Sequence, residues 1–303
     1  MAEFELIRRI IERLADTTQG RWIRLGPGDD GALTRVPLKQ ELVSSIDTLV
    51  ADVHFPHRAD AALIGYRAMM VSASDLAAMG ASPAFAMLAL TLPDSEPRWV
   101  ERLALGVQDA SRALGLPIAG GNLARGPLSI SVSVHGHVPH GQALTRSGAQ
   151  PGDELYVTGT LGAAAAALEL GELELCSFGE KLNSLNEHYF RPRARLLVGM
   201  ALRGIASAAI DVSDGLLQDV AHLCRASNVG VKLHSDAVPT HQESGLQEAL
   251  LGGDDYELVF SSNRTLPEMD VPICRIGMLT KETDILLDGH PVEISGYDHF
   301  EER

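Results

Sequence analysis

The sequence predicts a two-domain fold of the α+β class. Helical and strand patterns occur in both halves of the 303-residue chain, and one strand of the first half alternates strictly between apolar and polar residues. Between the halves, the segment RSGAQPGDEL at 146–155 gathers Gly, Pro and Asp, which are turn-forming residues. We therefore expect an N-terminal domain over 1–145 and a C-terminal domain over 146–303.

The N-terminal half is expected to alternate between helices and strands. Apolar residues at helical spacing predict a helix over 3–15, the apolar stretch 60–80 predicts a largely buried helix, and a third helix is expected over 97–114. The strands expected in this half are 41–49, 84–92, 116–121 and 128–138. The last of them carries the strict alternation, so it should be half-buried.

The C-terminal half continues the mixed pattern with shorter elements. An Ala-rich helix is expected from about residue 161, followed by helices over 192–207 and 215–227. The strands expected here are 154–159, 229–233, 256–260 and 273–279. Because both halves mix helices with strands, layered α+β packing is favoured over an all-parallel, doubly wound sheet.

The composition narrows the classes of partner. A net charge of -15 disfavours nucleic acid and anionic membranes, whose like charge this surface would repel. No stretch approaches the roughly 18 apolar residues of a membrane span, and the first residues follow an amphipathic helix pattern instead of a signal peptide. We therefore expect a cytoplasmic protein. Three widely separated cysteines argue against a disulfide framework and against a thiolate zinc site.

Several carboxylates stand where the neighbouring residues are typical of a core. Asp47 shares a strand face with Ser45, and Asp75 lies three residues from Ser72 on one helix face. Each alone is more often an ordinary buried polar group with hydrogen-bond partners. Taken together, they suit a hard cation such as Mg²⁺, which prefers oxygen ligands. The set comprises Asp30, Asp47, Asp75, Asp211 and Asp214.

The Gly-rich segment GPGDDG at 26–31 leaves three interpretations open. Its spacing matches a dinucleotide-binding loop, but no helical pattern follows it, and two aspartates would face the pyrophosphate with like charge. A plain tight turn is the second interpretation, because Gly and Asp are common turn residues. The third, which we favour, is a loop that bends around a metal held by Asp30, with or without Asp29.

Other motifs also have both a structural and a functional interpretation. The segment GGN at 120–122 forms a turn or lets a ligand approach the backbone closely. Arg146 is a phosphate clamp or a solvated surface residue. Asp219 follows Asp214 at a helical spacing that points it well away, so we expect it to serve structure. The spacing of His135, His137 and His140 is compatible with a zinc site, but we favour ordinary histidines that a strand tolerates.

The ordered motifs resemble those of the thiamine-monophosphate kinase family over nearly the whole chain. The matching blocks are GPGDDGAL, SIDTLVADVHF, SDLAAMGASP, GGNLARGPL, LTRSGAQPGDELYVTGTLG, AIDVSDGLLQDV, GGDDYEL and GYDHF. The resemblance implies the two-domain fold of aminoimidazole ribonucleotide synthetase and a homodimer that pairs two N-terminal sheets into a barrel. It also implies ATP-dependent phosphorylation of thiamine monophosphate to thiamine diphosphate, the last step of thiamine diphosphate biosynthesis, with several Mg²⁺ ions.

The family pattern implies a role for particular residues. The implied magnesium ligands are Asp30, Ser45, Asp47, Asp75, Asn122, Asp211 and Asp214. Among them, the catalytic set is Asp30, Asp75 and Asp211. The implied nucleotide contacts are Gly121, Asn122, Arg146 and Ser213. The implied contacts to the thiamine substrate are His54, Asp254 and Tyr297.

Three of these positions depart from the common family pattern. Asn122 stands where many members have Asp, Asp254 where they commonly have Glu, and Tyr297 where they often have Trp. An amide oxygen still ligates a metal, and a tyrosine ring still stacks. The phosphate of thiamine monophosphate is mostly dianionic at neutral pH, so direct in-line attack on ATP needs no strong general base.

Two alternatives remain, a sister enzyme of the same superfamily and a protein of a different class. A sister enzyme is the first, but selenophosphate synthetases usually carry a reactive Cys near the N-terminus, and the first cysteine here is Cys176. The hydrogenase maturation factor normally ends in a Cys-containing tail, whereas this chain ends in DHFEER. The second alternative is a non-catalytic acidic metal-binding or scaffold protein, which would bind metal without turnover.

Overall fold

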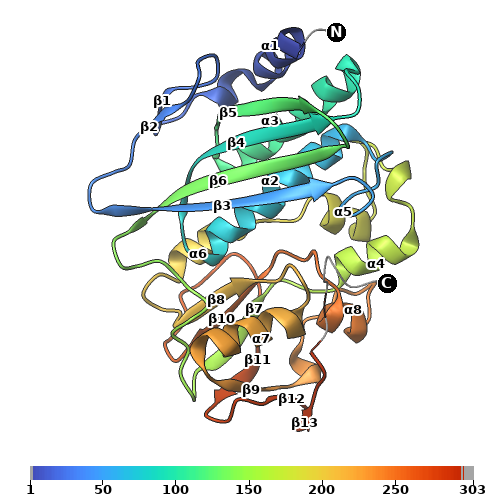
Figure 1. Ribbon diagram of the computed structural model, residues 1–303. Helices are drawn as coiled ribbons and strands as arrows, with labels where there is room; N and C mark the ends of the chain where they lie inside the picture. Colours follow the sequence, from blue (N-terminus) through green and yellow to red (C-terminus); the bar gives the residue numbers. More distant parts are fainter. Residues whose placement is uncertain (1–2, 295, 297–303) are drawn as a thin grey trace. The chain divides into compact units, whose positions relative to one another are not determined.

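The computed structural model describes residues 3–294 and 296. The chain divides into two compact units. The first contains the residues up to Leu76, Ala81–Gly141 and Gly171–Arg191, and the second contains Ala77–Gly80, Gln142–Leu170 and the residues from Pro192 onward. Each unit combines one larger sheet with helices (Figure 1), so the predicted α+β class is confirmed.

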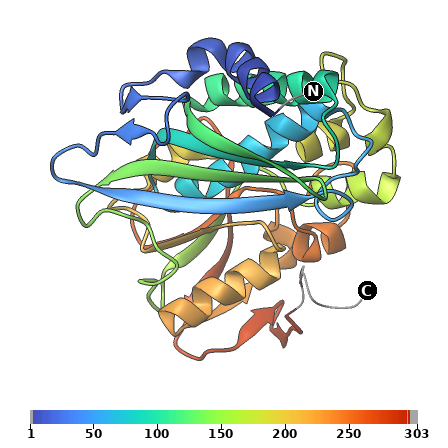
Figure 2. The same cartoon turned by 45° about the horizontal axis from the view of Figure 1, so that its top comes forward.

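The first unit contains a four-stranded sheet in the order β3-β6-β4-β5. Its strands are β3 (Gln40–Val50), β4 (Ser82–Leu92), β5 (Ile118–Arg125) and β6 (Ser129–Pro139). The β4 and β5 strands run parallel, while β3 and β4 both pair with β6 antiparallel. Both views show α2 (Ala61–Ala78) and α3 (Pro97–Leu114) along one face of this sheet (Figures 1 and 2). All four strands and both helices occur near their predicted positions.

The two long helices of this unit cross at very short range. A Cβ on Gly106 of α3 would collide with the backbone of Ala62 in α2, so the crossing requires glycine. The α3 helix begins at Pro97 with Glu96 accepting a hydrogen bond from the Arg98 amide at 3.2 Å, and it ends before Gly115 in the left-handed conformation. Although α2 is apolar, none of the described helices has the length and hydropathy to cross a membrane.

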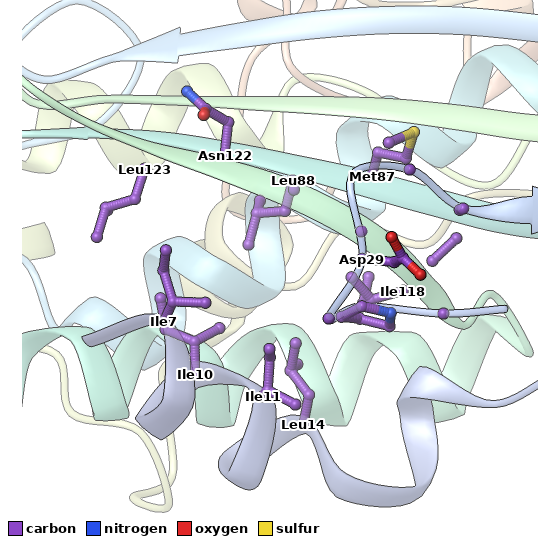
Figure 3. A pocket seen from close by; sticks show the side chains of 18 of the residues that line it. Ile7, Ile10, Ile11, Leu14, Asp29, Met87, Leu88, Ile118, Asn122 and Leu123 are labelled. Atoms are coloured by element: carbon purple, nitrogen blue, oxygen red, sulfur yellow. The ribbon is translucent and has the colours of Figure 1, made fainter. Parts of the chain in front are cut away.

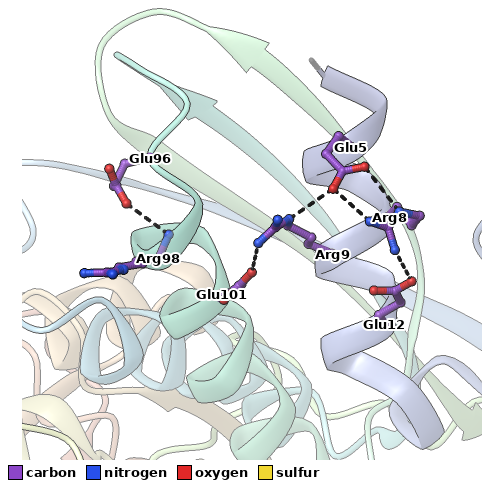
Figure 4. Close-up of polar contacts among 7 residues, drawn as sticks. All are labelled: Glu5, Arg8, Arg9, Glu12, Glu96, Arg98 and Glu101. Atoms are coloured by element: carbon purple, nitrogen blue, oxygen red, sulfur yellow. Dashed lines mark hydrogen bonds and ion pairs between the residues drawn. The ribbon is translucent and has the colours of Figure 1, made fainter. Parts of the chain in front are cut away.

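The N-terminal helix α1 (Glu3–Leu14) packs against α3 through one polar and one apolar face. Arg9 forms an ion pair with Glu101 of α3 at 2.5 Å, and Arg8 pairs with Glu5 and Glu12 on α1 itself (Figure 4). These exposed pairs contribute little stability each, so the apolar face carries most of the packing. A short helix, η1 (Ala15–Thr18), and a two-stranded sheet follow, with β1 (Ile23–Leu25) and β2 (Leu33–Thr34).

The segment Gly171–Arg191 belongs to the first unit although it follows β7 in the sequence. It contains η2 (Leu173–Leu175) and α5 (Ser184–Phe190), whose first turn is capped by the Asn183 side chain accepting from the Asn186 amide at 2.8 Å. The sequence did not predict α5. The helix predicted over 192–207 is wrong in extent: only α6 (Leu196–Ala201) forms, and residues 192–195 before it belong to no helix or strand.

The second unit contains a seven-stranded sheet in the order β13-β12-β9-β11-β7-β10-β8. Its strands are β7 (Glu154–Thr158), β8 (Ala208–Asp211), β9 (Gly230–Leu233), β10 (Leu258–Ser262), β11 (Ile273–Thr280), β12 (Ile285–Leu287) and β13 (His290–Pro291). The helical elements of this unit besides α6 are α4 (Ala163–Leu170), α7 (Leu216–Ser227), η3 (Ser235–Ala237) and α8 (Leu246–Leu251). Its core joins residues of α7 with residues of several strands, such as Val157 of β7, Ile210 of β8 and Val220 of α7.

Candidate functional site

The two carboxylates predicted in the first unit lie together. Ser45 of β3 donates a hydrogen bond to an oxygen of Asp75 on α2 at 2.5 Å. Asp47 lies two residues further along the same strand face, close to Ser72, which is one turn before Asp75 and donates its hydroxyl to the Ala68 carbonyl at 3.0 Å. The strand period of two and the helix period of 3.6 thus bring four oxygen-bearing side chains to one place beneath the sheet.

Ionisation of both carboxylates in this pair is unfavourable. Burial first, and the neighbouring Asp75 carboxylate second, raise the pKa of Asp47 from 3.8 to about 6, while the nearby Ser72 hydroxyl opposes that rise. A divalent cation would relieve both causes at once, because it offsets the lost hydration and screens the repulsion. The donor set of hydroxyl and carboxylate oxygens is the one that Mg²⁺ prefers.

The Gly-rich loop lies on the wall of a cavity of about 510 Å³ in the same unit (Figure 3). Asp29, Asp30, Gly121 and Asn122 line one part of it. No helix follows Gly31, since β2 begins two residues later, so the dinucleotide-loop interpretation is wrong. Asp30 is exposed, and its amide donates to the Asp29 side chain at 2.9 Å, which is ordinary turn geometry.

The opposite wall of the cavity is apolar and comes from α1. Figure 3 shows Ile7, Ile10, Ile11 and Leu14 of this helix across from the strand residues. The three isoleucines are only partly buried, so they offer apolar surface to the cavity. The cavity therefore combines an apolar wall with backbone and carboxylate groups, which is the usual build of a small-molecule site.

Gly121 has a structural role within this wall. A Cβ at this position would collide with the carbonyl group of Leu88 on the neighbouring strand β4, so only glycine allows β5 to pair there. Asn122 follows it, is exposed, and lines the cavity. The sequence interpretation of a turn at 120–122 is wrong, because these residues continue β5 as far as Arg125.

The second unit places the predicted Asp211, Ser213 and Asp214 at the end of β8, just before α7. Asp211 is 5% exposed, whereas Ser213 and Asp214 are half-buried. Asp219 is 2% exposed, and its carboxylate accepts hydrogen bonds from the amides of Ser213 at 3.0 Å and Asp214 at 3.1 Å. Asp219 thus holds the turn that carries the other two carboxylates.

The structural role predicted for Asp219 is confirmed, but its predicted direction is wrong. Helical periodicity does not apply to Asp214, because α7 begins only at Leu216, and the Asp219 side chain reaches back over the first turn. Burial first, and the charges of Asp211 and Asp214 second, raise the pKa of Asp219 to about 8. Three acidic groups therefore share this turn.

Asp254 lies beside the same turn. Its amide donates to the Ser213 carbonyl at 2.9 Å, and the Tyr256 amide donates to the Val212 carbonyl at 2.8 Å. Both Asp254 and Tyr256 have positive φ, so the chain is not yet a strand here. The strand predicted at 256–260 accordingly begins only at Leu258. Asp254 also accepts a hydrogen bond from the Tyr256 hydroxyl at 2.8 Å.

Arg146 is exposed and lies near α7. The pKa of His222 on that helix is lowered, first by the burial of the histidine and second by the charge of Arg146. The charge of Asp214 acts on the same histidine in the opposite direction. Arg146 and Asp214 thus lie on the same side of the second unit. The Arg146 carbonyl accepts from the Ser227 hydroxyl at 3.0 Å, which ties the segment that carries it to the end of α7.

The structure thus gathers the predicted residues at two places in the first unit and around one turn in the second. The first unit holds Ser45, Asp47 and Asp75 together, with Asp30, Gly121 and Asn122 around the cavity. The second holds Asp211, Ser213, Asp214 and Asp254 around one turn, with Arg146 on the same side. In residues 3–294 and 296, no three His, Cys, Asp or Glu side chains are already arranged as a metal cluster. Tyr297 lies outside the described residues.

His54 is held in a tight loop between β3 and α2. Its ring Nδ1 accepts from the Val50 amide at 3.0 Å, and its carbonyl accepts from the Tyr189 hydroxyl at 2.9 Å. Sequence reasoning missed Tyr189 and its neighbour Arg67. An arginine inside an otherwise apolar helix was the available signal, because a buried charge needs partners.

The strand histidines do not form a zinc site. His135 stacks on Phe85 and has its two ring nitrogens within hydrogen-bond distance of Ser44 and Ser133. His137 is 2% exposed and packs edge-on against Trp22. The interpretation as tolerated strand histidines is therefore the better one.

The chain is similar to known proteins over nearly its whole length. The family model of the AIR synthase related protein N-terminal domain matches residues 28–138, and that of the C-terminal domain matches residues 150–266. Thiamine-monophosphate kinase of Escherichia coli strain K12 is 42% identical over 324 aligned positions, which cover 98% of each chain.

Two solved structures extend the comparison. The crystal structure of thiamine-monophosphate kinase from Stenotrophomonas maltophilia K279a has a TM-score of 0.86 and 39% identity, and covers 96% of this chain and 98% of that one. The structure of AaThiL complexed with AMPPCP and TMP has a TM-score of 0.81 and 31% identity, and covers 98% of this chain and 97% of that one. Both AIR synthase related domains and the near-complete similarity show that this chain belongs to the thiamine-monophosphate kinase family.

Proposed function

We propose that this chain transfers the γ-phosphoryl group of ATP to the phosphate of thiamine monophosphate. The products are thiamine diphosphate and ADP. The observation that carries the proposal is the match, over nearly the whole chain, to a structure that holds an ATP analogue together with TMP. The oxygen-rich groups of the two units support it, because phosphoryl transfer between two anions requires strong charge neutralisation.

Magnesium would be held by the oxygen ligands described above. In the first unit these are Ser45, Asp47, Asp75, Asp30 and Asn122, and in the second Asp211 and Asp214. The raised pKa of Asp47 supports this assignment, since a carboxylate pair without a cation is costly to ionise. When bound, Mg²⁺ supplies positive charge that neutralises the phosphate oxygens of both substrates.

The cavity beside α1 would receive the nucleotide. Its volume of about 510 Å³ is within the range of small-molecule sites. The apolar wall formed by Ile7, Ile10 and Ile11 suits the base, and the opposite wall with Gly121 and Asn122 suits the phosphate end. In the second unit, Arg146 is a separate proposed phosphate contact, because it is exposed and offers bidentate donors.

The chemistry needs positioning more than acid or base catalysis. A bond forms between an oxygen of the thiamine monophosphate phosphate and the γ-phosphorus, while the bond from that phosphorus to the β–γ bridging oxygen breaks and ADP departs. The attacking phosphate is already ionised at neutral pH, so no residue has to remove a proton. His54, Asp254 and Tyr297 would hold the thiamine part, and Ser213 would contact the nucleotide.

We propose in addition that two copies pair through β3. This strand is eleven residues long, lies at the edge of its sheet, and exposes Ile46 to 64% and Leu42 to 45%. A long edge strand with apolar residues is a site for pairing with a second chain. Ile46→Lys should therefore convert a dimer to a monomer in light scattering, and an unchanged mass would refute this interface.

We also propose a cytoplasmic location, where ATP is available.

One assay tests the activity. Purified protein is incubated with Mg²⁺ and ATP, with and without thiamine monophosphate, and thiamine diphosphate and ADP are quantified. We expect equal amounts of the two products, formed only with the full mixture. Turnover with an aminoimidazole precursor or with selenide instead would assign the chain to a sister activity. Metal binding without turnover of any of these substrates would favour a scaffold protein.

A further inference from the structure

The segment 21–39, which contains β1, β2 and the Gly-rich loop between them, is basic in an acidic protein. The chain has a net charge of -15, yet this segment carries four basic residues against two aspartates. All four basic side chains are exposed, and none forms an ion pair with a described residue; they are Arg21, Arg24, Arg35 and Lys39. Positive charge is therefore concentrated in one segment of a protein whose mean charge repels anions.

This segment forms part of the wall of the cavity beside α1. The residues between its two strands, 26–32, all line that cavity. Arg24 precedes them by two positions and Arg35 follows them by three. Because consecutive Cα atoms are about 3.8 Å apart, the backbones of both arginines lie within about 12 Å of the wall. This distance is comparable with the screening length of about 10 Å at about 0.1 M salt, so both charges act on an ion that approaches the cavity.

The backbone of the hairpin leaves both arginines out of cross-strand ion pairs. Strand β1 pairs with β2 at Ile23 and Leu25 but not at Arg24, which is therefore the extra residue of a β-bulge. Bulges redirect side chains and are common beside active sites. On the other strand, the Arg35 amide donates to the Trp22 carbonyl at 2.8 Å, so its backbone is fixed beside β1. The hairpin thus holds two cations close to its loop without using their charges for its own stability.

Packing of the hairpin on the first sheet keeps these charges near the cavity. Trp22 lies edge-on to His137 of β6, with ring centroids 5.0 Å apart, and packs against a small core formed by β4 and β5. Met87 packs against the same core and also lines the cavity. The Arg21 guanidinium lies 4.6 Å from the centre of the Trp22 ring. The start of the hairpin is therefore anchored beside the cavity.

We propose that Arg24 and Arg35 attract magnesium-bound ATP to the cavity and raise its association rate, without contacting it once it is bound. The inference rests on the proposed function, because it takes this cavity as the nucleotide site. Exposed charges at the rim of a site act mainly on the association rate and on its salt dependence. The two aspartates of the segment lie in the loop, where the Mg²⁺ proposed at Asp30 would offset their charge.

The test measures binding without turnover. Stopped-flow fluorescence follows N-methylanthraniloyl-ATP with Mg²⁺ as it binds the wild type and Arg24→Gln/Arg35→Gln. For two positive charges acting on a net charge of about −2 over roughly 10 Å of water, association should be about eightfold slower in the variant at about 0.01 M ionic strength. At about 0.15 M the difference should shrink to about twofold. The dissociation rate should stay within about twofold of the wild type.

Two further variants separate charge from shape and from net charge. Arg24→Lys/Arg35→Lys keeps both charges but loses the planar guanidinium groups, so it should associate as fast as the wild type. Arg98→Gln/Lys181→Gln is the matched control, because it changes the net charge equally at two exposed residues that do not line the cavity. Figure 4 shows Arg98 on the side of α3 away from α1. This control should slow association less than about 1.5-fold.

Several results would overturn the proposal. A slower association that persists at about 1 M salt, or a faster dissociation, would indicate direct contact with the nucleotide instead of long-range attraction. An equal loss in the matched control, or no recovery in the lysine variant, would also count against it. If the wild type binds the nucleotide but forms no thiamine diphosphate, the proposed function falls, whereas these rates still decide the role of the two arginines. A wild type that binds no nucleotide would overturn the inference as well.

Discussion

Replacing Asp47 by Asn should stabilise the metal-free protein at neutral pH. Burial and the neighbouring Asp75 raise the pKa of Asp47 from 3.8 to about 6. The folded state therefore retains a proton that the unfolded chain releases, and stability falls as the pH rises from 3.8 to about 6. Since one pH unit corresponds to about 1.4 kcal/mol, the full cost above that range is at most about 3 kcal/mol.

Asn is nearly isosteric with the protonated carboxyl and carries no charge, so the variant avoids this cost. Its unfolding free energy should exceed that of the wild type by up to about 3 kcal/mol at about pH 8, and by less than about 1 kcal/mol at about pH 4. Urea unfolding followed by circular dichroism in the presence of EDTA measures both values. Asp236→Asn, at an exposed position of η3, should change neither value by more than about 0.5 kcal/mol.

The same variant should lose part of the response to Mg²⁺. A ligand that binds only the folded state raises stability by RT ln(1 + [L]/Kd), so the wild type should gain stability with Mg²⁺ and AMPPCP more than Asp47→Asn does. An equal gain in both proteins would remove Asp47 from the magnesium site. If the unfolding free energies of the two proteins differed by the same amount at both pH values, the electrostatic reasoning would be refuted. A difference caused by side-chain shape alone would not depend on pH.

Three further predictions concern single side chains. Asp75→Asn should lower kcat about 100-fold or more without lowering the melting temperature, because it removes a proposed magnesium ligand; a kcat within about threefold of wild type would exclude that role. Arg195→Met should cost about 3 to 5 kcal/mol in urea unfolding, because it leaves the buried Glu257 carboxylate without its cation; a loss below about 1 kcal/mol would contradict this. His137→Leu should raise the unfolding free energy by about 1 kcal/mol, because both ring nitrogens are buried with no hydrogen-bond partner among the described residues, whereas His135→Leu should lower it.

The meeting of Asp47 with Asp75 was predictable from the sequence because both obey simple periods. Strand alternation places Ser45 and Asp47 on one face, and helical spacing places Ser72 and Asp75 on another, so the fold only has to bring the two faces together. The same logic found β3 and α2, whose bounds differ from the prediction by one or two residues. Long helices and strands with a clear hydrophobic period are predicted reliably from a sequence.

The parts that failed depend on conformations that no period describes. Asp254 and Tyr256 have positive φ without being glycine, so β10 starts later than its apolar pattern suggests. Asp219 points back at Asp214 because the helix starts between them. The assignment of Gly171–Arg191 to the first unit depends on contacts between residues far apart in the sequence: Tyr189 and the acceptor of its hydroxyl, His54, are separated by 135 positions. Such contacts leave no local pattern in a single sequence.

Helix α2 shows how contacts between distant parts of the sequence could still be suspected from the sequence. It is almost entirely apolar and buried, yet it carries two charged residues, Arg67 and Asp75, eight positions apart. Each has its partner on a different element: Asp75 meets Ser45 of β3, and Arg67 meets Tyr189 of α5. Because burying a charge in a helix core costs more than it contributes to packing, each such residue indicates an interaction that the apolar pattern cannot supply. Applied consistently, that argument selects Arg67 as well as Asp75 from the sequence alone. It does not identify the partner, which is why the role of Tyr189 required the structure.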